Sequence, residues 1–326
     1  MKNVLICGAT GFIGRNLTLY FAKDPNFQVY AVKHKRPKYI VENSINEVIW
    51  READLRNNAD VKKALEGIDI VIQAAATTSG SKDIVNQPYI HVTDNALMNS
   101  ILLRESMNNG IEHFIFFSCT VMYKSSDKPI KESDWDGSME IHDRYFGVAN
   151  TKIYIEKMLD FYSRISEMKT TAIRHSNIYG PFDKFDFERS HVFGATISKV
   201  LTADKNVVVW GTGEEERDLL YIEDLLDFVK LSILNQKKKY QLFNCGYGKS
   251  ISIKDLVFLI IKTSRRNLKV KYDLSKPTIK TSLCLDNTLA EDELKWKPKV
   301  SLEKGVSKTI KWWEDNIDPV KLIMNF

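Results

Sequence analysis

The sequence has few cysteines and no long apolar run. Its four cysteines are far apart, lack the spacing of a metal site and fit a reduced, cytoplasmic compartment; they are Cys7, Cys119, Cys245 and Cys284. The longest strongly apolar stretch, residues 256–261, is far too short to cross a bilayer, and the N-terminal apolar run has only the length of a strand. We therefore expect no signal peptide, no membrane segment and no bound metal.

The sequence also lacks a strong excess of charge, internal repeats and low-complexity segments. Its 47 basic and 42 acidic residues give a net charge of +5, which is too small and too scattered to argue for nucleic acid as a partner. With 44% hydrophobic residues, the 326-residue chain can bury one large core or two moderate ones.

The first chemical signal is a glycine-rich turn at the start of the chain. Val4-Leu5-Ile6-Cys7 predicts a buried parallel strand, and residues 16–22 predict a helix. Between them, Gly8, Gly11 and Gly14 are spaced three residues apart. Such glycines let the backbone approach a pyrophosphate, whose charge the helix N-terminus attracts. This strand–turn–helix context disfavours a turn without a ligand and predicts a dinucleotide site made by Gly8, Gly11, Phe12, Ile13, Gly14 and Arg15.

The end of the second predicted strand, residues 27–32, carries a basic cluster. Lys33-His34-Lys35-Arg36 follows it, and no acid lies between Asp24 and Glu42. An acid at this place bonds the ribose hydroxyls of NAD, whereas basic side chains attract the 2′-phosphate of NADP. We therefore favour NADP(H) over NAD(H), with Lys33 and Arg36 at the phosphate; the alternative is a solvated loop.

Predicted strands and helices alternate through the first half of the chain. Short apolar runs alternate with helical segments, the runs at residues 47–50, 69–73, 114–117 and 170–174 and the helices at 61–65, 93–107 and 148–164. This series predicts an α/β fold with a Rossmann-type, doubly wound parallel sheet. We expect residues 1–180 to form the NADP-binding domain, with a later return near 215–245, and residues 181–326 to form mainly a smaller α/β substrate-binding domain.

A set of motifs covers nearly the whole chain, from Met1 to about Trp313. It comprises the glycine turn, Asp54-Leu55-Arg56, Ala74-Ala75-Ala76, Ser118-Cys119-Thr120-Val121-Met122-Tyr123, Lys152 with Glu156, and Arg174-His175-Ser176-Asn177-Ile178-Tyr179-Gly180-Pro181. Together these motifs resemble those of the extended short-chain dehydrogenases/reductases of the nucleotide-sugar epimerase/dehydratase class. The resemblance implies an NAD(P)-dependent enzyme in which Asp54, Leu55, Ala74, Ala75, Ala76 and Lys152 contact the cofactor.

Within that class the later motifs most resemble the GDP-fucose synthases, which are NADPH-dependent 3,5-epimerase/4-reductases. The supporting residues are Ser190-His191-Val192, residues 207–213 and Arg217. The resemblance implies a nucleotide-diphosphate sugar as partner, bound by Thr120, Asn177, His191, Lys199, Trp210 and Arg217. Arg217 suits a diphosphate because its guanidinium matches paired phosphate oxygens. Four of these residues also have a structural alternative: Asn177 as a turn residue, Lys199 as a solvated lysine, Trp210 as a core residue, and Arg217 as a partner for residues 214–216.

The catalytic positions of the class are altered in this sequence. The class uses a tyrosine and a lysine four residues later, on one helical face, and a serine or threonine that bonds the reacting oxygen. Lys152 is identified by Glu156 and by its distance to the Asn177 block, so the tyrosine position is Val148. The hydroxyl position falls on Cys119. The cysteine that serves GDP-fucose synthases as epimerisation base is replaced by Val121, although His191 matches its partner histidine.

Three interpretations of this loss remain open. In the first, the protein is a working enzyme whose acid/base residues are rearranged and drawn from Lys152, His191, Cys119 and Tyr145. In the second, it binds cofactor and sugar without turnover. In the third, Tyr145 is the ordinary tyrosine in a register one turn away, which leaves no lysine four residues later. We favour the first.

The expected reaction is reduction by NADPH of the 4-keto group of a nucleotide-diphosphate sugar, a GDP-sugar being favoured. Epimerisation is expected to be weak or absent, because Val121 cannot act as a base. An epimerase or a dehydratase of the same family is the alternative. By resemblance alone, we also expect a homodimer formed through the helices at residues 93–107 and 148–164.

Overall fold

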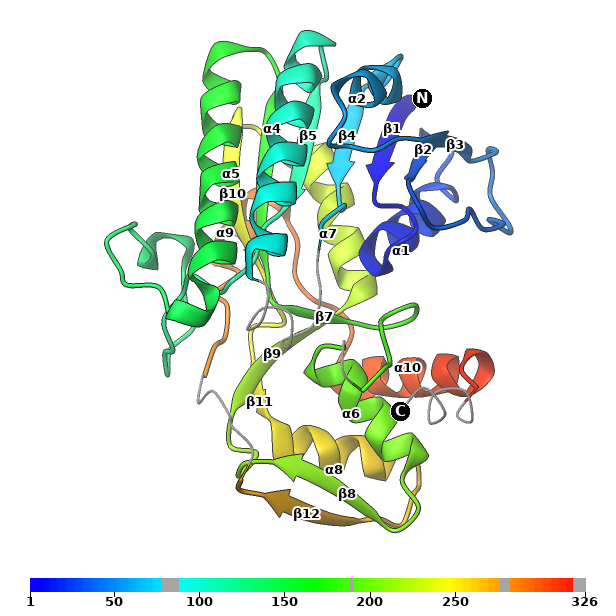
Figure 1. Cartoon of the computed structure of the whole chain (residues 1–326), viewed down its shortest axis with the longest axis vertical. Helices are drawn as coiled ribbons and strands as arrows, with labels where there is room; N and C mark the ends of the chain where they lie inside the picture. The colour runs from blue at the N-terminus through cyan, green and yellow to red at the C-terminus, as the bar shows by residue number, and fades with distance from the viewer. Residues whose placement is uncertain (78–87, 188–189, 276–281, 319–326) are drawn as a thin grey trace.

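A parallel sheet covered by helices on both faces forms the larger part of the molecule (Figure 1). The structure is a computed structural model that describes residues 1–77, 88–187, 190–275 and 282–318. Within them, seven parallel strands join in the order β10-β6-β5-β4-β1-β2-β3. They are β1 (Lys2–Cys7), β2 (Phe27–Lys33), β3 (Ile49–Glu52), β4 (Ile70–Gln73), β5 (His113–Phe117), β6 (Lys169–His175) and β10 (Tyr240–Cys245). The order reverses between β1 and β4, where such sheets bind ligands.

The strands are apolar because both faces of the sheet are covered. Every residue of β4 and β5 is buried. Successive side chains of β1 alternate between the two layers: Val4 and Ile6 belong to one apolar cluster, whereas Leu5 and Cys7 belong to the other. The strand thus anchors both halves of the core, and its last residue leads directly into the glycine turn.

Helices in the described part of the chain form these two layers. Helices α1 (Phe12–Phe21) and α7 (Ile222–Asn235) contact each other on the face of Val4. Helices α2 (Asn58–Leu65), α4 (Thr93–Asn108) and α5 (Phe146–Ile165) cover the face of Leu5, with α4 lying against both α2 and α5. Side chains at helical spacing, such as Ile155 and Leu159 of α5, pack onto this face.

Most of the remaining strands and helices form a smaller lobe below the sheet in Figure 1. Strands β7 (Asn177–Tyr179), β9 (Glu216–Tyr221) and β11 (Ser250–Ser252) form one sheet in the order β11-β9-β7, and β8 (Asn206–Trp210) pairs with β12 (Lys269–Asp273). Helices α6 (Val192–Thr202), α8 (Ile253–Thr263) and α10 (Leu302–Asn316) pack around them, while α9 (Thr288–Leu294) lies against α7 and β10. One apolar cluster includes Val4 of the sheet and Ile197 of α6, so the core continues between the lobes.

The predicted fold class, a doubly wound parallel sheet of Rossmann type, is confirmed. The long helices expected at 93–107 and 148–164 are α4 and α5. The strand expected at 47–50 begins two residues later, at Ile49. Of the late segments, α7 and β10 lie in the larger part of the molecule, whereas β9 pairs with β7 and β11. The domain boundary near residue 180 stays a prediction. None of the helices in the described ranges is long and apolar enough to cross a membrane.

Candidate active site

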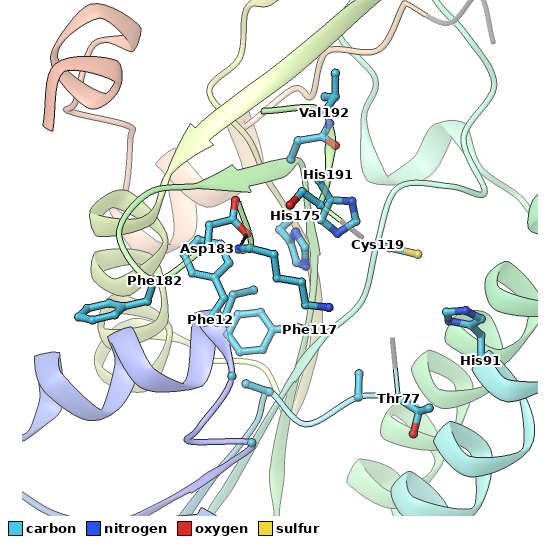
Figure 2. Close-up of a pocket in the computed structure, with 18 of the residues that line it drawn as sticks. Phe12, Thr77, His91, Phe117, Cys119, His175, Phe182, Asp183, His191 and Val192 are labelled. Atoms are coloured by element: carbon cyan, nitrogen blue, oxygen red, sulfur yellow. Dashed lines mark hydrogen bonds between the residues drawn. The ribbon is translucent and has the colours of Figure 1, made fainter. Parts of the chain in front are cut away.

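A cavity of about 2170 Å³ lies where the strand ends of the larger sheet meet the smaller lobe. The glycine turn lines one part of it, and residues from α5 and from the ends of β5 and β6 line another. Residues of α6, β8 and β9 complete the wall. Figure 2 shows labelled residues of both lobes around this space, including Phe12 and His91 from the larger part and His191 from the smaller lobe.

The glycine turn leaves space that side chains would otherwise fill. Gly8 has a φ of 72°, and a Cβ there would lie 2.7 Å from the backbone of Ala75. A Cβ on Gly14 would lie 2.1 Å from the carbonyl oxygen of Gly8, so Gly14 permits close packing of α1 behind the turn. Helix α1 has no side-chain cap at Gly11 and no acid in its first turn. Its N–H groups therefore suit an anion, and the turn fits a dinucleotide pyrophosphate.

Arg15 lies beside this turn, held between two aromatic rings. Its guanidinium carbon is 4.2 Å from the ring centre of Tyr39 and 4.1 Å from that of Phe182. The Nε atom is buried and, among the described residues, has no hydrogen-bond partner. A cationic donor fixed next to the glycine turn would be satisfied by a phosphate oxygen, which supports the predicted role of Arg15 at the cofactor.

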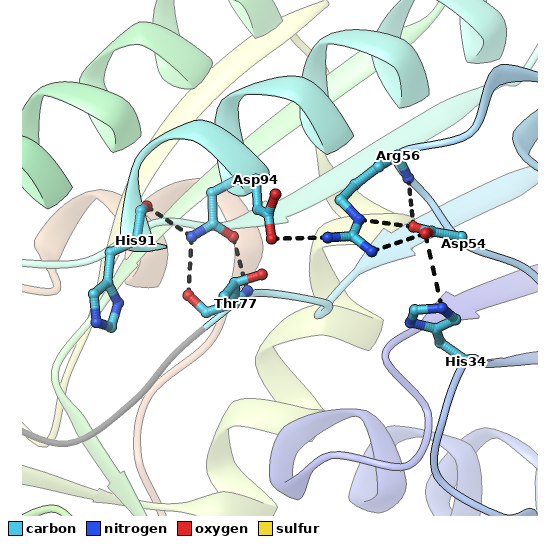
Figure 3. Close-up of polar contacts among 7 residues, drawn as sticks. His34, Asp54, Arg56, Thr77, His91 and Asp94 are labelled. Atoms are coloured by element: carbon cyan, nitrogen blue, oxygen red, sulfur yellow. Dashed lines mark hydrogen bonds and ion pairs between the residues drawn. The ribbon is translucent and has the colours of Figure 1, made fainter. Parts of the chain in front are cut away.

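A network of ion pairs lies at the other end of the predicted cofactor site (Figure 3). Arg56 pairs with Asp54 at 2.8 Å and with Asp94 at 2.9 Å, and His34 lies 3.7 Å from Asp54. The hydrogen bond from Arg56 lowers the pKa of Asp54 to about 2, so this carboxylate stays ionised at neutral pH. These groups line the cavity together with four other predicted residues, Leu55, Ala74, Ala75 and Ala76.

The four residues of the basic cluster at the end of β2, Lys33 to Arg36, differ in their surroundings. Lys33 pairs with Glu52, an acid at the end of β3, and is absent from the described lining of the cavity. His34, Lys35 and Arg36 do line it, and Arg36 donates to the carbonyl oxygen of Thr10 at 3.4 Å. The sequence pattern could not reveal Glu52, because it is brought to Lys33 by the pairing of β2 with β3.

The predicted tyrosine–lysine position lies on the first turns of α5. Val148 and Lys152 both line the cavity, one helical turn apart. The ammonium of Lys152 donates to the carbonyl oxygen of Phe117 at 2.7 Å and lies 4.5 Å from the ring centre of Phe116. Burial lowers the pKa of Lys152. The lysine is therefore held at the strand ends, while the position one turn earlier offers only an aliphatic side chain.

Cys119 lies near Lys152, and its sequence neighbours Ser118 and Thr120 differ from it in their contacts. Burial raises the pKa of the Cys119 thiol, which makes it a weak neutral donor. Ser118 is committed elsewhere, because its hydroxyl donates to Glu156. Thr120, predicted to bind substrate, is not among the described residues that line the cavity. Cys119 is thus the residue of this segment whose side chain best fits the hydroxyl position.

Glu156 joins a buried network behind the cavity floor. It accepts two hydrogen bonds from Arg174, at 3.0 and 2.6 Å, and both side chains are 4% exposed. Arg174 also donates to the hydroxyl of Tyr123 at 3.0 Å, and that hydroxyl donates to Asn244. The network ties α5 to β6 and to the segment after β5, so it fixes the strand ends that carry the site.

Tyr145 lies at the N-terminus of α5, after a single 3₁₀ turn, η3 (Asp143–Tyr145). Burial lowers the pKa of Arg217 on β9, and the nearby Tyr145 and Glu215 oppose this effect. The phenol therefore lies close to Arg217. Tyr145 precedes Lys152 by seven positions, which corresponds to about 10 Å along a helix axis. This placement favours a role for Tyr145 at the substrate end of the cavity over one beside Lys152.

The other predicted substrate residues line the same end. Asn177, His191, Lys199, Trp210 and Arg217 all belong to the cavity wall. His191 is the N-cap residue of α6 and makes no side-chain capping bond. The ammonium of Lys199 lies 4.8 Å from the ring centre of Trp210, whose side chain is 51% exposed. This exposure excludes the alternative that Trp210 is a core residue.

His175 and Asp183 are among the ionisable side chains of the cavity that sequence reasoning missed. His175, the last residue of β6, is partly buried, and burial lowers its pKa to about 4. Asp183 accepts from the amide of Lys184 at 2.7 Å, while its Oδ2 is buried and lacks a hydrogen-bond partner in the described part of the chain. Burial raises the pKa of Asp183 to about 7. Both residues adjoin or belong to the Arg174–Pro181 motif, which was the available signal. Within the described ranges, no group of three or more potential ligands could hold a metal.

The chain belongs to the NAD dependent epimerase/dehydratase family, whose profile matches residues 4–246. It is 30% identical over 318 residues to GDP-L-colitose synthase of Yersinia pseudotuberculosis, covering 95% of this chain and 97% of that one. It is 27% identical over 291 residues to GDP-L-fucose synthase of Escherichia coli strain K12, covering 83% and 90%. It is thus an NAD(P)-dependent short-chain dehydrogenase/reductase of the nucleotide-sugar class, as the sequence motifs predicted.

Two further similarities concern activity and fold. The chain is 25% identical over 320 residues to dTDP-4-dehydro-6-deoxy-D-allose reductase of a Streptomyces species, covering 96% of each chain. A solved structure of UDP-N-acetylglucosamine 4-epimerase from Methanobrevibacter ruminantium M1, in complex with UDP-N-acetylmuramic acid, superimposes with a TM-score of 0.85 at 24% identity, covering 97% of this chain and 99% of that one. At this identity the superposition establishes the fold alone.

Proposed function

We propose that the protein reduces the 4-keto group of a GDP-linked deoxysugar with NADPH. The observation that carries this proposal is one continuous cavity that joins the glycine turn, Lys152 and the diphosphate candidate Arg217. Relatives named as GDP-sugar synthases and as a 4-keto nucleotide-sugar reductase support the choice of substrate. A bound nicotinamide cofactor would supply the hydride for this reduction.

The chain's own residues would bind, orient and polarise the sugar. Lys152, which donates to the carbonyl oxygen of Phe117, would hold the nicotinamide ribose and keep positive charge near the developing alkoxide. The neutral Cys119 thiol would contact the reacting oxygen as a weak donor. Val148 excludes water from the position of the usual phenol. Orientation in the cavity would therefore supply much of the rate enhancement.

The substrate's diphosphate would lie between β9 and α6. Arg217 offers a planar guanidinium there, and α6 presents its N-terminus after His191 without a side-chain cap. Lys199 would add charge beside Trp210. Tyr145, close to Arg217, would contact the same part of the substrate.

NADP(H) is the preferred cofactor in this proposal. Lys35 and Arg36 line the cavity beyond the glycine turn and are exposed, so both are available to a 2′-phosphate. Because Lys33 pairs with Glu52, it would contribute less than the sequence pattern indicates.

Epimerisation is proposed to be weak or absent. Val121 lines the cavity where GDP-fucose synthases carry a cysteine base, and an aliphatic side chain cannot remove a proton. A binding protein without turnover is the second candidate, and Val148 is the observation that favours it. An epimerase or a dehydratase of the same family remains the other reaction class to test.

We also propose a cytoplasmic homodimer. Helices α4 and α5 carry exposed apolar side chains, among them Leu97, Tyr154, Phe161 and Ile165. A second copy of these helices would cover them. Sedimentation velocity of wild type and of a Phe161→Glu variant would test the assembly: the proposal expects a dimer for the first and a monomer for the second.

The proposed reaction is tested by mixing the NADPH-bound protein with GDP-4-keto-6-deoxymannose and following cofactor fluorescence in a single turnover. Loss of fluorescence with formation of a reduced sugar is the expected result. Retained fluorescence across a panel of 4-keto nucleotide sugars, despite demonstrated NADPH binding, would leave the binding-protein interpretation in its place.

A further inference from the structure

The end of β6 brings a histidine, His175, into the cavity that Val148 and Lys152 also line. Phe117 of β5 pairs with Ile173 of β6, and the amide of Ser118 donates to the carbonyl oxygen of Ile173 at 2.8 Å. The two strands run parallel, so Cys119, two residues beyond Phe117, and His175, two residues beyond Ile173, follow neighbouring strand ends. Both residues line the cavity, and Figure 2 shows them in the same region as His191.

The imidazole of His175 is held in one orientation. Its Nδ1 lies 2.7 Å from the carbonyl oxygen of Ser176. Because a carbonyl only accepts, this nitrogen carries the proton, and Nε2 carries the lone pair of the neutral ring. The ring also packs edge-on against Phe117, with 6.0 Å between ring centres. Nε2 has no hydrogen-bond partner among the described residues, so it remains available to a ligand.

Charged and ionisable groups from three other segments surround this ring. Lys152 approaches from α5 and His191 from the start of α6, and both add to the effect of burial, which lowers the pKa of His175 to about 4. Cys119 lies alongside after β5, with its thiol neutral because burial raises its pKa. The ring is therefore neutral at pH 7.

We infer that His175 is the proton-transfer residue for the reacting sugar oxygen, in place of the tyrosine that Val148 replaces. The inference rests on the proposed function. As the carbonyl carbon receives a hydride from the reduced nicotinamide dinucleotide, the proton on Nε2 of the imidazolium passes to the carbonyl oxygen. On the sugar, one C–H bond and one O–H bond form and the C=O π bond breaks. The donating C–H bond of the nicotinamide and the N–H bond of the imidazolium also break, so the cofactor is left oxidised and the imidazole neutral until solvent protonates it again.

This assignment gives the reaction a characteristic pH dependence. The acid form of the ring carries the proton, and above its low pKa the fraction of that form falls about tenfold per pH unit. The rate of single-turnover reduction should therefore fall steadily as the pH rises from 5.5 to 8. Installing a tyrosine at position 148 should supply a second donor and remove most of this dependence.

A double-mutant cycle at positions 148 and 175 tests the assignment. His175→Gln keeps an N–H that can reach the Ser176 carbonyl but removes the titrating group, and Val148→Tyr restores the phenol. Single-turnover reduction of GDP-4-keto-6-deoxymannose is measured for wild type, both single variants and the double variant. We expect His175→Gln to be about 10²–10⁴ slower than wild type and the double variant to regain at least about tenfold.

Two controls separate the possible failures. NADPH affinity should stay within about threefold in all four proteins, which a disrupted fold would not allow. Histidine NMR of the cofactor-free protein should assign to His175 a pKa well below the usual 6.5, and its signals should shift on addition of GDP-mannose, which has no ketone.

An active wild type with an equally active His175→Gln variant would overturn the assignment alone, as would a slow variant that Val148→Tyr fails to rescue. NMR signals of His175 that do not shift on addition of GDP-mannose would overturn it as well. A wild type that binds NADPH but reduces no 4-keto sugar would overturn the proposed function, and the assignment with it.

Discussion

The cofactor end and the reaction end of the cavity differ in how they depend on sequence. At the cofactor end, the proposed binding would use backbone N–H groups and the absence of side chains at Gly8 and Gly14. At the reaction end, the family chemistry depends on single side chains, and three of those positions hold Cys119, Val121 and Val148. A surface built from backbone tolerates sequence change around it, whereas a proton donor is lost with one substitution. The chain therefore retains the means to bind a dinucleotide while its proton transfer must be rearranged.

The largest expected effect comes from a change in the buried Glu156–Arg174 pair behind the reaction end of the cavity. Glu156→Ala would leave the guanidinium of Arg174 buried without its counter-ion, and we expect a loss of about 3–5 kcal/mol in the free energy of unfolding. Urea denaturation measures it. Glu167→Ala is the matched control, since Glu167 pairs with Lys239 at the surface with 95% of its side chain exposed. Equal stability of the two variants would contradict a structural role for the buried pair.

The second largest effect is a loss of NADPH affinity caused by a change in the glycine turn at the cofactor end. A methyl group on Gly14 would lie 2.1 Å from the carbonyl oxygen of Gly8, so Gly14→Ala should displace the turn and weaken NADPH binding at least about 100-fold. Gly67→Ala is the control: Gly67 also has a positive φ, 68°, but open space around it. That variant should lose about 1 kcal/mol of stability and no NADPH affinity, as seen by fluorescence titration.

A third change separates substrate from cofactor within the same cavity. Arg217→Ala removes the guanidinium proposed to contact the diphosphate and should raise the KM for the nucleotide sugar about 10–100-fold. The Kd of NADPH should not change, because the glycine turn lies at the other end. Steady-state kinetics and a binding titration measure the two quantities. A parallel loss of both affinities would mean that the two ends are not independent.

A fourth change sharpens the description of the cofactor end. Arg36→Ala should weaken NADPH binding about tenfold and leave NADH binding unaltered, because only NADPH has the 2′-phosphate that this exposed guanidinium would meet. Lys33→Ala should have less effect, since Lys33 already pairs with Glu52. Competitive titration with both cofactors compares the variants, and a larger effect for Lys33 would favour the simpler expectation from sequence.

The smallest effect concerns Asp183 and the pH dependence of stability. Burial raises its pKa from 3.8 to about 7, so the folded state binds this proton more tightly than the unfolded chain does. The wild type should therefore lose stability as the pH rises from about 4 to 7, and no more from this group above that. Asp183→Asn should remove this slope and raise the Tm at pH 8 by a few degrees. Thermal melts at pH 5 and pH 8 decide it; the same shift at both pH values would argue against titration of Asp183.

The parts of the molecule that follow from short sequence patterns were predictable. The glycine turn, the apolar runs of β4 and β5, and the spacing of Lys152 from Glu156 are local signals, and the structure places them in a doubly wound sheet. Helix α5 even begins at Phe146, two residues before the predicted start at Val148. Local periodicity suffices here because a parallel sheet needs apolar strands and amphipathic helices in alternation.

The remaining features depend on contacts between distant segments. Lys33 meets Glu52 only because β2 and β3 pair, and Tyr145, before α5, affects the pKa of Arg217 on β9 although the two are far apart in the sequence. His175 carries no motif of its own, and its position is decided by where β6 ends. Thr120 was expected at the substrate by its place in a motif, but the segment turns after Phe117 and its neighbour Cys119 lines the cavity.

The central claim is that this chain transfers hydride to a sugar carbon without a tyrosine at position 148. The most direct measurement uses NADPH deuterated at the transferred position of the nicotinamide, GDP-4-keto-6-deoxymannose and NMR analysis of the recovered sugar. The account predicts one deuterium at C4 of a reduced sugar. Recovery of the unlabelled keto sugar from a protein that has bound the labelled cofactor would contradict it.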